Sequence, residues 1–166
     1  VQNHGSDYAA SYLAQPGCSE HHTGLAVDFA LYLEASGATA DFAGTGDYAR
    51  LVEHAWEYGF IRRYPENKRD VTGIAYEAWH FRYVGVPHSA YMTENNLCLE
   101  EYIDLLRKDY SYSDKPLEYS YEGVDYLIYF CPAQSSESVT FVPVPASGEY
   151  TVSGNNVDGF IVTVTK

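Results

Sequence analysis

The sequence predicts an α+β fold with a β-rich C-terminal part, and three observations support this prediction. Large apolar or aromatic residues recur at every second position from Leu25 to Leu33 and from Trp79 to Val84, which is the period of a strand. Between these segments, residues 47–58 place apolar residues at helical spacing. After about residue 110, short strand-like segments are separated by turns.

One face of the predicted strand at 25–33 is informative because small residues surround a carboxylate there. Asp28 has Ala26 and Ala30 as its neighbours on that face. The opposite face carries Leu25, Val27, Phe29 and Leu31. Small side chains beside Asp28 leave room for a ligand above it. A loop is expected to follow from Gly37 to Thr45.

The middle of the chain predicts a helix, a short strand and a turn in succession. The helix is expected from Asp47 to Tyr58, and Gly59 suits its C-terminal cap. Phe60 to Tyr64 predicts a short strand, and Pro65 to Lys68 predicts a turn. The strand from Trp79 to Val84 comes next.

Two short helices are expected after that strand, from Pro87 to Asn95 and from Leu99 to Lys108. The second begins with acidic residues and ends with basic ones, which suits the helix dipole. The tail predicts four strands, at Val124–Phe130, Ser138–Val142, Glu149–Val152 and Phe160–Val164. We therefore expect a first domain over residues 1–109 and a small antiparallel β appendage, with no evident chemistry, over residues 110–166.

Composition and charge argue against several classes of partner. The 166 residues suit one domain with a small appendage. A net charge of −13 disfavours nucleic acid and anionic membrane surfaces, which require a basic face. No stretch approaches the roughly 18–20 apolar residues of a membrane span, so we expect no membrane insertion within this chain. The three cysteines lack CxxC spacing, and the sequence does not decide whether Cys98 and Cys131 form a disulfide.

Two short clusters, residues 19–28 and 77–80, carry the residue types of a catalytic zinc site. The first reads Ser-Glu-His-His-Thr-Gly-Leu-Ala-Val-Asp and the second Glu-Ala-Trp-His. A zinc hydrolase needs three protein ligands, an open position and a base that does not touch the metal. Alone, the spacing of His21 and Asp28 arises by chance in many proteins, and His80 with Glu77 is more often a core histidine with a surface carboxylate. Together, and next to two predicted strands, they indicate a zinc site.

The histidines and Glu77 differ in how well their positions suit a metal site. His22 competes with its neighbour His21 as a ligand. The other histidines lack a strand setting: His4, His54 and His88. Glu77 and His80 differ in strand parity, so both can face one metal only if Glu77 lies on a bend or bulge just before the strand.

The patterns Ser-x-His-x-x-Gly-x-Ala-x-Asp and Glu-x-Trp-His resemble those of the zinc D,D-peptidases of the D-alanyl-D-alanine carboxypeptidase class. This class includes carboxypeptidases and dipeptidases of vancomycin resistance and some phage endolysins, and it shares its fold with the hedgehog signalling domain. The resemblance covers about residues 5–108 and extends through the segments 16–21, 59–65, 72–74, 77–85 and 99–102.

This resemblance implies a small antiparallel sheet that carries a Zn²⁺ site and is flanked by helices. It implies that His21, Asp28 and His80 bind the zinc and that Glu77 is the general base. Ser19 occupies a position that lies near the bound substrate in relatives. The implied activity is hydrolysis of the terminal D-Ala-D-Ala bond of peptidoglycan stem peptides, in an extracytoplasmic location.

The sequence departs from the family in one respect. Relatives carry an upstream segment with an arginine that is thought to bind the oxyanion or the substrate carboxylate, and this chain begins after that position. We therefore expect either that the chain lacks this upstream segment or that another cation takes the place of its arginine. Arg62, Arg63 and Arg82 are candidates, although a structural ion pair is the more ordinary role in so acidic a chain.

Several alternative functions stay open at this stage. The same chemistry would serve a D,D-dipeptidase, an L,D-carboxypeptidase or a stem-peptide endopeptidase, because pocket walls decide which bond is cut. A non-catalytic, zinc-stabilised module that binds the cell wall is another alternative, because the hedgehog relatives show that the fold can be non-catalytic. The aromatic β tail is a further candidate, as a binder of wall glycan.

Overall fold

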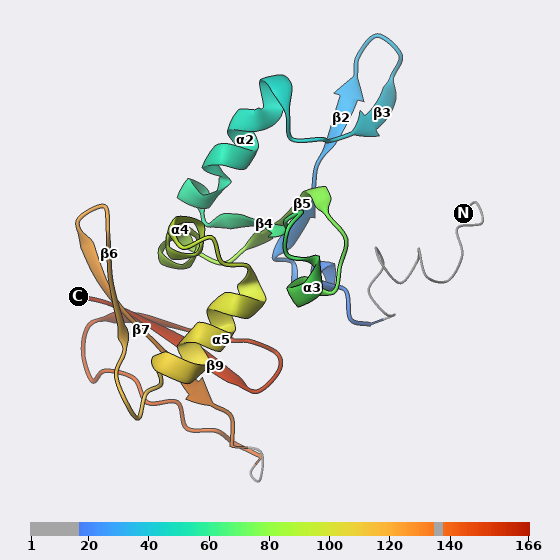
Figure 1. The fold of residues 1–166 in the computed structure, drawn as a ribbon. Coiled ribbons are helices and arrows are strands. Elements are labelled where there is room, and N and C mark those ends of the chain that lie inside the picture. The colour runs from blue at the N-terminus through green and yellow to red at the C-terminus, as the bar shows by residue number, and fades with distance from the viewer. Residues whose placement is uncertain (1–16, 135–137) are drawn as a thin grey trace. The chain divides into compact units, whose positions relative to one another are not determined.

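The computed structural model describes residues 17–134 and 138–166, which form two compact units (Figure 1). The first unit ends at Cys98 and the second begins at Leu99. Both contain helices and antiparallel strands, so the α+β prediction is confirmed. The prediction of a catalytic domain over residues 1–109 concerns function and stays a prediction.

A three-stranded antiparallel sheet is the framework of the first unit. Its strands are β1 (Ala26–Asp28), β5 (Glu77–Tyr83) and β4 (Phe60–Tyr64), in the order β1-β5-β4. The predicted strand at 60–64 is confirmed, and the strand predicted from Trp79 begins two residues earlier. The register places Asp28 directly opposite His80, which puts the two side chains on one face of the sheet.

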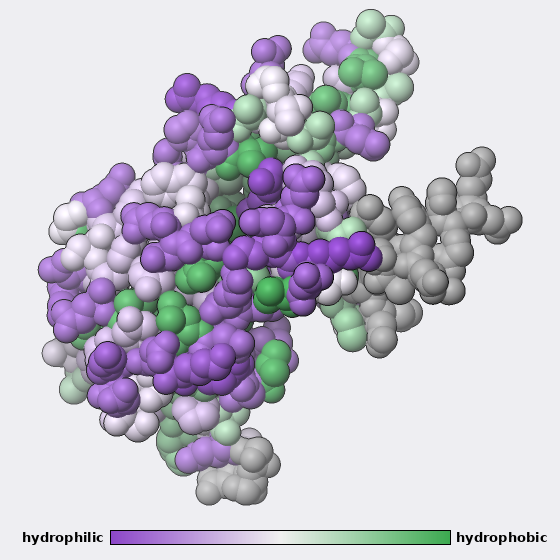
Figure 2. Space-filling view, viewed as in Figure 1, coloured by the Kyte–Doolittle hydropathy of each residue, from purple (hydrophilic) through white to green (hydrophobic). Residues whose placement is uncertain are grey.

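The segment predicted as one strand over residues 25–33 is two strands in two different sheets. β1 pairs with β5, whereas β2 (Ala30–Leu33) forms a hairpin with β3 (Ala38–Asp41) (Figure 1). Strand β3 lies inside the segment that was predicted as a loop. Because apolar alternation continues across the junction at Phe29, it did not reveal the change of partner. Hydrophobic residues lie at the surface of this hairpin (Figure 2), and Tyr32 and Leu33 are both exposed.

The helix predicted over residues 47–58 is helical throughout, but it is broken into three pieces. These are η2 (Gly46–Tyr48), α2 (Ala49–His54) and η3 (Ala55–Tyr58), of which η2 and η3 are 3₁₀ turns. The indole of Trp56 donates to the carbonyl of Glu53 at 2.8 Å, and the tighter turn begins within this span. Gly59 ends the run in the left-handed conformation, as predicted.

The remaining helices of the first unit are α3 (Arg69–Thr72), which the sequence did not predict, and α4 (Val86–Glu94), which it predicted within one residue. The short helix η1 (Glu20–Thr23) precedes β1. Phe81 is 1% exposed and contacts the rings of Phe29 and Phe42, with centroids 5.3 and 6.4 Å away. An aromatic core therefore lies on the face of the sheet opposite His80.

The second unit pairs one helix with a four-stranded antiparallel sheet of order β6-β7-β9-β8. Helix α5 (Leu99–Asp109) matches its prediction and packs against β7. The strands are β6 (Leu117–Tyr121), β7 (Val124–Pro132), β8 (Glu149–Gly154) and β9 (Gly159–Thr165). Three of them were predicted; β6 was missed although Leu117, Tyr119 and Tyr121 alternate.

The predicted strand at Ser138–Val142 is wrong. Residues 138–142 have no strand structure, and Val142 packs against the buried cluster of Tyr129, Val162 and Val164. The Tyr129 hydroxyl donates to the carbonyl of Pro143 at 2.7 Å. Pro143, which directly follows the segment, cannot donate to a β ladder, and Val142 packs on the sheet through its side chain.

Two other expectations concern the whole chain. All three cysteines, Cys18, Cys98 and Cys131, are free thiols, so the Cys98–Cys131 disulfide that the sequence left open is not formed. Within residues 17–134 and 138–166, helices are all too short or too polar to span a membrane.

Gly59 gives a test of this fold. Its φ is +83°, and a Cβ there would lie 2.7 Å from the Tyr83 ring and 3.1 Å from the Gly85 backbone. Gly73 has a φ of +73° and open space around it. We expect Gly73→Ala to cost about 1 kcal/mol, from the left-handed backbone alone. Gly59→Ala should cost clearly more, because steric overlap adds to the same strain.

Urea unfolding followed by tryptophan fluorescence measures this difference. Both tryptophans, Trp56 and Trp79, belong to the first unit, so the signal reports on that unit. Equal destabilisation by the two substitutions would show that the close approach at Gly59 is relieved at no cost.

Candidate metal centre

Three elements bring three potential metal ligands together. Helix η1 carries His21 and is capped by Gly24, whose left-handed conformation (φ +72°) turns the chain towards β1. Asp28 is the last residue of β1, and His80 lies opposite it in β5. The compact turn at Gly24 thus returns the chain so that His21 and Asp28 face the same point.

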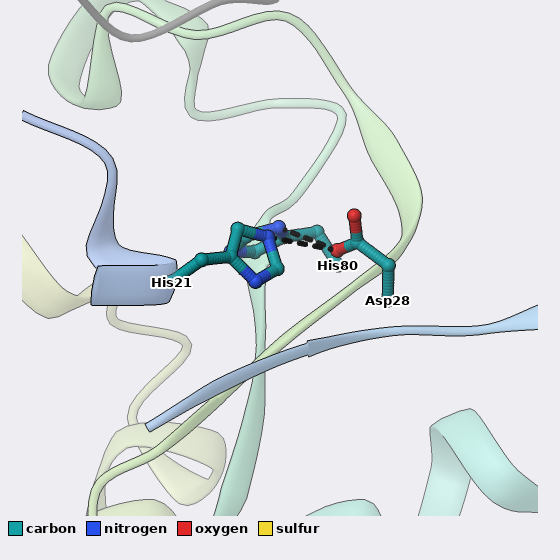
Figure 3. Close-up of side chains that lie close together, drawn as sticks. All are labelled: His21, Asp28 and His80. Carbon is teal, nitrogen blue, oxygen red and sulfur yellow. Dashed lines mark ion pairs between the residues drawn. The ribbon is translucent and has the colours of Figure 1, made fainter. Parts of the chain in front are cut away.

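Within residues 17–134 and 138–166, one group of three or more metal-ligating side chains is found: His21, Asp28 and His80 (Figure 3). Their donor atoms lie within 4.8 Å of one another. The Asp28 Oδ1 atom is 2.8 Å from Nδ1 of His80 and 3.4 Å from Nε2 of His21. The two imidazole rings meet edge to face, with centroids 4.8 Å apart.

This donor set fits a zinc ion. Four ligands about 2.0–2.1 Å from zinc in a tetrahedron lie about 3.3 Å from each other, and the Asp28 oxygen lies 3.4 Å from the His21 nitrogen and 2.8 Å from the His80 nitrogen. Two nitrogens and one carboxylate oxygen are ligands that zinc accepts. The side chains of His21 and Asp28 are 41% and 48% exposed, whereas that of His80 is 6% exposed. The group therefore has a buried side and a side open to solvent.

Glu77 lies beside this group without being part of it. Its Oε2 atom is 3.7 Å from Nδ1 of His80. The pairing of β4 with β5 is irregular here, because β4 advances from Arg62 to Tyr64 while β5 goes from Phe81 to Glu77. The irregularity that the parity of Glu77 and His80 predicted is thus confirmed.

The environment of Glu77 favours a carboxyl group that can exchange a proton. Its side chain is 8% exposed. Burial raises the pKa of Glu77, and the negative charges of Asp28 and Glu20 add to this, against the opposing effect of His80. A carboxyl group with a raised pKa is typical of a general acid or base.

The other residues considered from the sequence differ in their positions relative to the donor group. Ser19 precedes η1 as its N-cap residue, half-buried and close to His21 in the chain. His22 is exposed and does not belong to the donor group, so the structure favours His21 over its neighbour. His54 pairs with Glu57, at 2.6 Å. His4 lies outside the described residues.

Glu20 is a residue of the site that sequence reasoning missed. Its Oε1 atom lies 2.7 Å from Nε2 of His80, on the far side of the imidazole from Asp28. Its Oε2 atom accepts hydrogen bonds from Arg82 at 2.7 Å and from Arg63 at 3.2 Å. The available signal was a third carboxylate next to a ligand histidine, with several arginines to be paired in an acidic chain.

These contacts also settle the role of the candidate arginines. Arg63 and Arg82 form ion pairs with Glu20, which is the structural role considered from the sequence. Arg62 pairs in register with Phe81, on the other face of the sheet, and its guanidinium stacks over Tyr76. None of the three is therefore assigned to the carboxylate of a substrate.

Charge and burial work against each other in this network. Burial alone would raise the pKa of Glu20, but the hydrogen bond from His80 and the two arginines lower it to about 2. Burial alone would lower the pKa of His80, but Glu20, Asp28 and Glu77 outweigh it and raise that pKa. The site thus holds an excess of negative charge around His80, which suits a bound cation.

A pocket of about 420 Å³ lies on the opposite face of the sheet from the donor group. Its walls are mostly apolar and include Val27 and Phe81. These residues face each other in the register step next to Asp28 and His80, so strand alternation separates the pocket from the donors. The metal centre opens to solvent on its own face and not into this pocket.

Comparisons with known proteins agree with these features. The model of the VanY family, described as D-alanyl-D-alanine carboxypeptidase, matches residues 1–86. A D-alanyl-D-alanine carboxypeptidase of Enterococcus faecium is 43% identical over 95% of this chain and 48% of its own length. The bifunctional D-Ala-D-Ala dipeptidase and carboxypeptidase VanXYC of Enterococcus gallinarum is 43% identical over 64% of this chain and 57% of its own length.

A solved structure resembles nearly the whole chain. It is the vancomycin-resistance D,D-dipeptidase VanXYg in complex with a D-Ala-D-Ala phosphinate analogue, with a TM-score of 0.84 and 38% identity. The similarity covers 97% of this chain and 63% of that one. The chain thus spans about half the length of the first curated relatives it matches and under two thirds of this structural relative.

The Glu20 network predicts a specific acid sensitivity of the metal-free protein. The pKa of Glu20 falls from an ordinary value of 4.5 to about 2 on folding, so between these values the unfolded chain binds more protons than the folded one. About 3 kcal/mol of stability is present above pH 4.5 and is lost as the pH falls towards 2. Glu20→Gln should lower stability at neutral pH and flatten this dependence.

Urea unfolding at a series of acidic pH values, followed by tryptophan fluorescence, checks this prediction. Glu57→Gln is a suitable control, because Glu57 forms an exposed ion pair with His54 in the same unit as the tryptophans. Parallel pH profiles of the wild type and Glu20→Gln would contradict the expectation.

Proposed function

The chain belongs to the VanY family of D-alanyl-D-alanine carboxypeptidases, and we propose that it carries the zinc centre of a D,D-carboxypeptidase. The proposed reaction removes the terminal D-alanine from a peptidoglycan stem peptide. The observation that carries the proposal is the convergence of His21, Asp28 and His80 next to the buried carboxyl group of Glu77.

In this proposal His21, Asp28 and His80 hold one Zn²⁺ ion. Three protein ligands leave a fourth position open, as catalytic zinc sites require. When bound, zinc supplies a Lewis acid that polarises the scissile carbonyl and makes water more acidic. The exposed sides of His21 and Asp28 leave this position accessible to a peptide.

Glu77 acts as the general base in the same proposal. It accepts a proton from the attacking water and returns it to the amine of the departing D-alanine. The raised pKa of Glu77 brings it closer to the pH at which both steps run. Its location beside the donor group, and not in it, keeps its oxygens free for this transfer. Ser19, two residues before His21, is proposed to lie on the substrate side.

Glu77 also favours an enzyme over a zinc-stabilised binding module. A carboxyl group that is 8% exposed and surrounded by other carboxylates is costly to keep. A purely structural metal site has no need of such a group. The proposed substrate belongs to the cell wall, so we propose an extracytoplasmic location.

A second candidate is D,D-dipeptidase activity. It is favoured by a specific observation: the VanXYg structure, which is similar over 97% of this chain, is that of a D,D-dipeptidase. The two activities use the same chemistry and differ in whether free D-Ala-D-Ala or a longer peptide occupies the site.

Comparing substrates separates the two candidates. Zinc-loaded protein is incubated with D-Ala-D-Ala and with a stem pentapeptide that ends in D-Ala-D-Ala, and released D-alanine is measured. Faster release from the pentapeptide supports the carboxypeptidase, and faster release from the dipeptide supports the dipeptidase. The absence of release from either peptide by folded, zinc-loaded chain would contradict both candidates for the chain as it stands.

Two substitutions separate zinc binding from chemistry. His80→Ala should abolish stoichiometric zinc binding, because it removes the buried ligand. Glu77→Gln should retain zinc and lower the rate of D-alanine release about 10²- to 10⁴-fold, because general-base catalysis is lost. Zinc content by atomic absorption and D-alanine release are measured on the same samples.

His54→Ala is the matched control for His80→Ala, because His54 also pairs with a carboxylate but lies outside the donor group. It should retain zinc. Full activity of Glu77→Gln, or full zinc content of His80→Ala, would refute the proposed roles.

A further inference from the structure

His80 is the donor whose orientation is the most constrained, because both of its ring nitrogens contact carboxylates. Nδ1 faces the metal group, 2.8 Å from Oδ1 of Asp28. Nε2 faces away from that group, 2.7 Å from Oε1 of Glu20. The ring is nearly buried, at 6% exposure. Glu20 therefore touches a candidate ligand without being a candidate ligand itself.

The carboxylate of Glu20 is itself held in place. Its second oxygen, Oε2, accepts hydrogen bonds from Nη1 of Arg82 in β5 and from Nε of Arg63 in β4. The Glu20, Arg63 and Arg82 side chains are 14%, 11% and 17% exposed, so solvent screens these pairs only in part. Two strands thus fix a residue of η1 that stands directly before His21.

We propose that Glu20 is a positioning residue of the metal site, which sets the tautomer and orientation of His80. This inference rests on the zinc site of the proposed function. An ionised carboxylate only accepts hydrogen bonds, and a neutral imidazole has one N–H and one lone pair. With the proton on Nε2 directed at Glu20, the lone pair of Nδ1 points to Asp28 and the metal position. A carboxylate behind a ligand histidine orients the ring and makes it a stronger donor.

Arg63 and Arg82 have a part in this arrangement. They hold Oε2, which leaves Oε1 for His80 and keeps the carboxylate ionised near the two other acidic groups of the site, Asp28 and Glu77. A purely structural role is the competing explanation, in which Glu20 only neutralises the two arginines. Loss of stability in a Glu20 variant agrees with both explanations, so stability does not distinguish them. The affinity for zinc and the protonated nitrogen of His80 do.

The first test compares zinc affinities of three proteins by competition with a chromophoric chelator at neutral pH. Glu20→Gln keeps the size of the side chain but presents an amide that cannot serve both His80 and the arginines. We expect its affinity for Zn²⁺ to fall about 10- to 100-fold. Glu57→Gln is the matched control, because Glu57 pairs with His54 outside the donor group, and its affinity should equal that of the wild type.

The second test needs no variant, and therefore stands even if Glu20→Gln fails to fold. Long-range ¹H–¹⁵N correlation spectra of the zinc-loaded wild type identify which nitrogen of His80 carries the proton. The expected pattern is a protonated Nε2 and an unprotonated Nδ1.

The outcomes separate this inference from the proposed function. If folded Glu20→Gln binds zinc as tightly as the wild type, or if Nδ1 of His80 carries the proton, Glu20 does not position His80. The proposed zinc site is unaffected by either result. A wild type whose zinc binding does not depend on His80 overturns the proposed site and this inference together.

Discussion

The antiparallel pairing of β1 with β5 is the constraint on which the rest of the site depends. Its register places Asp28 opposite His80 and Val27 opposite Phe81. The same two strands therefore present polar donors to one face and an aromatic core to the other. A slip of one residue would exchange these faces, burying Asp28 among aromatic rings. The packing of Phe81 with Phe29 and Phe42 holds the register and with it the geometry of the donors.

Local departures from regular structure complete what the register begins. The irregular pairing of β4 with β5 turns Glu77 towards His80, which a straight strand would not allow. The left-handed Gly24 turns the chain from η1 into β1 and so brings His21 back over Asp28. Regular strands fix the positions of two donors, and these two irregularities add the third donor and the proposed base.

The site contains several negative charges close together, and nearby arginines compensate only part of them. Asp28 and Glu77 lie near His80, whereas Glu20 forms ion pairs with Arg63 and Arg82. In a chain with a net charge of −13, two of the ten basic lysine and arginine residues are thus committed to one carboxylate. The side that faces Asp28 is left anionic, which is the electrostatic condition that a divalent cation relieves.

By itself, the sequence determined the α+β class, the end of the helix at Gly59, the two clusters that contain the candidate ligands and the irregularity at Glu77, because short spacings and strand parity are local properties. Only the tertiary structure decided that the chain changes sheets at Phe29, that residues 138–142 form no strand, and that Glu20 supports His80 from 60 positions away. Periodicity shows which residues share a face, but it does not show which strand they pair with or which side chains meet. Those contacts depend on register and on the packing of segments distant in the chain.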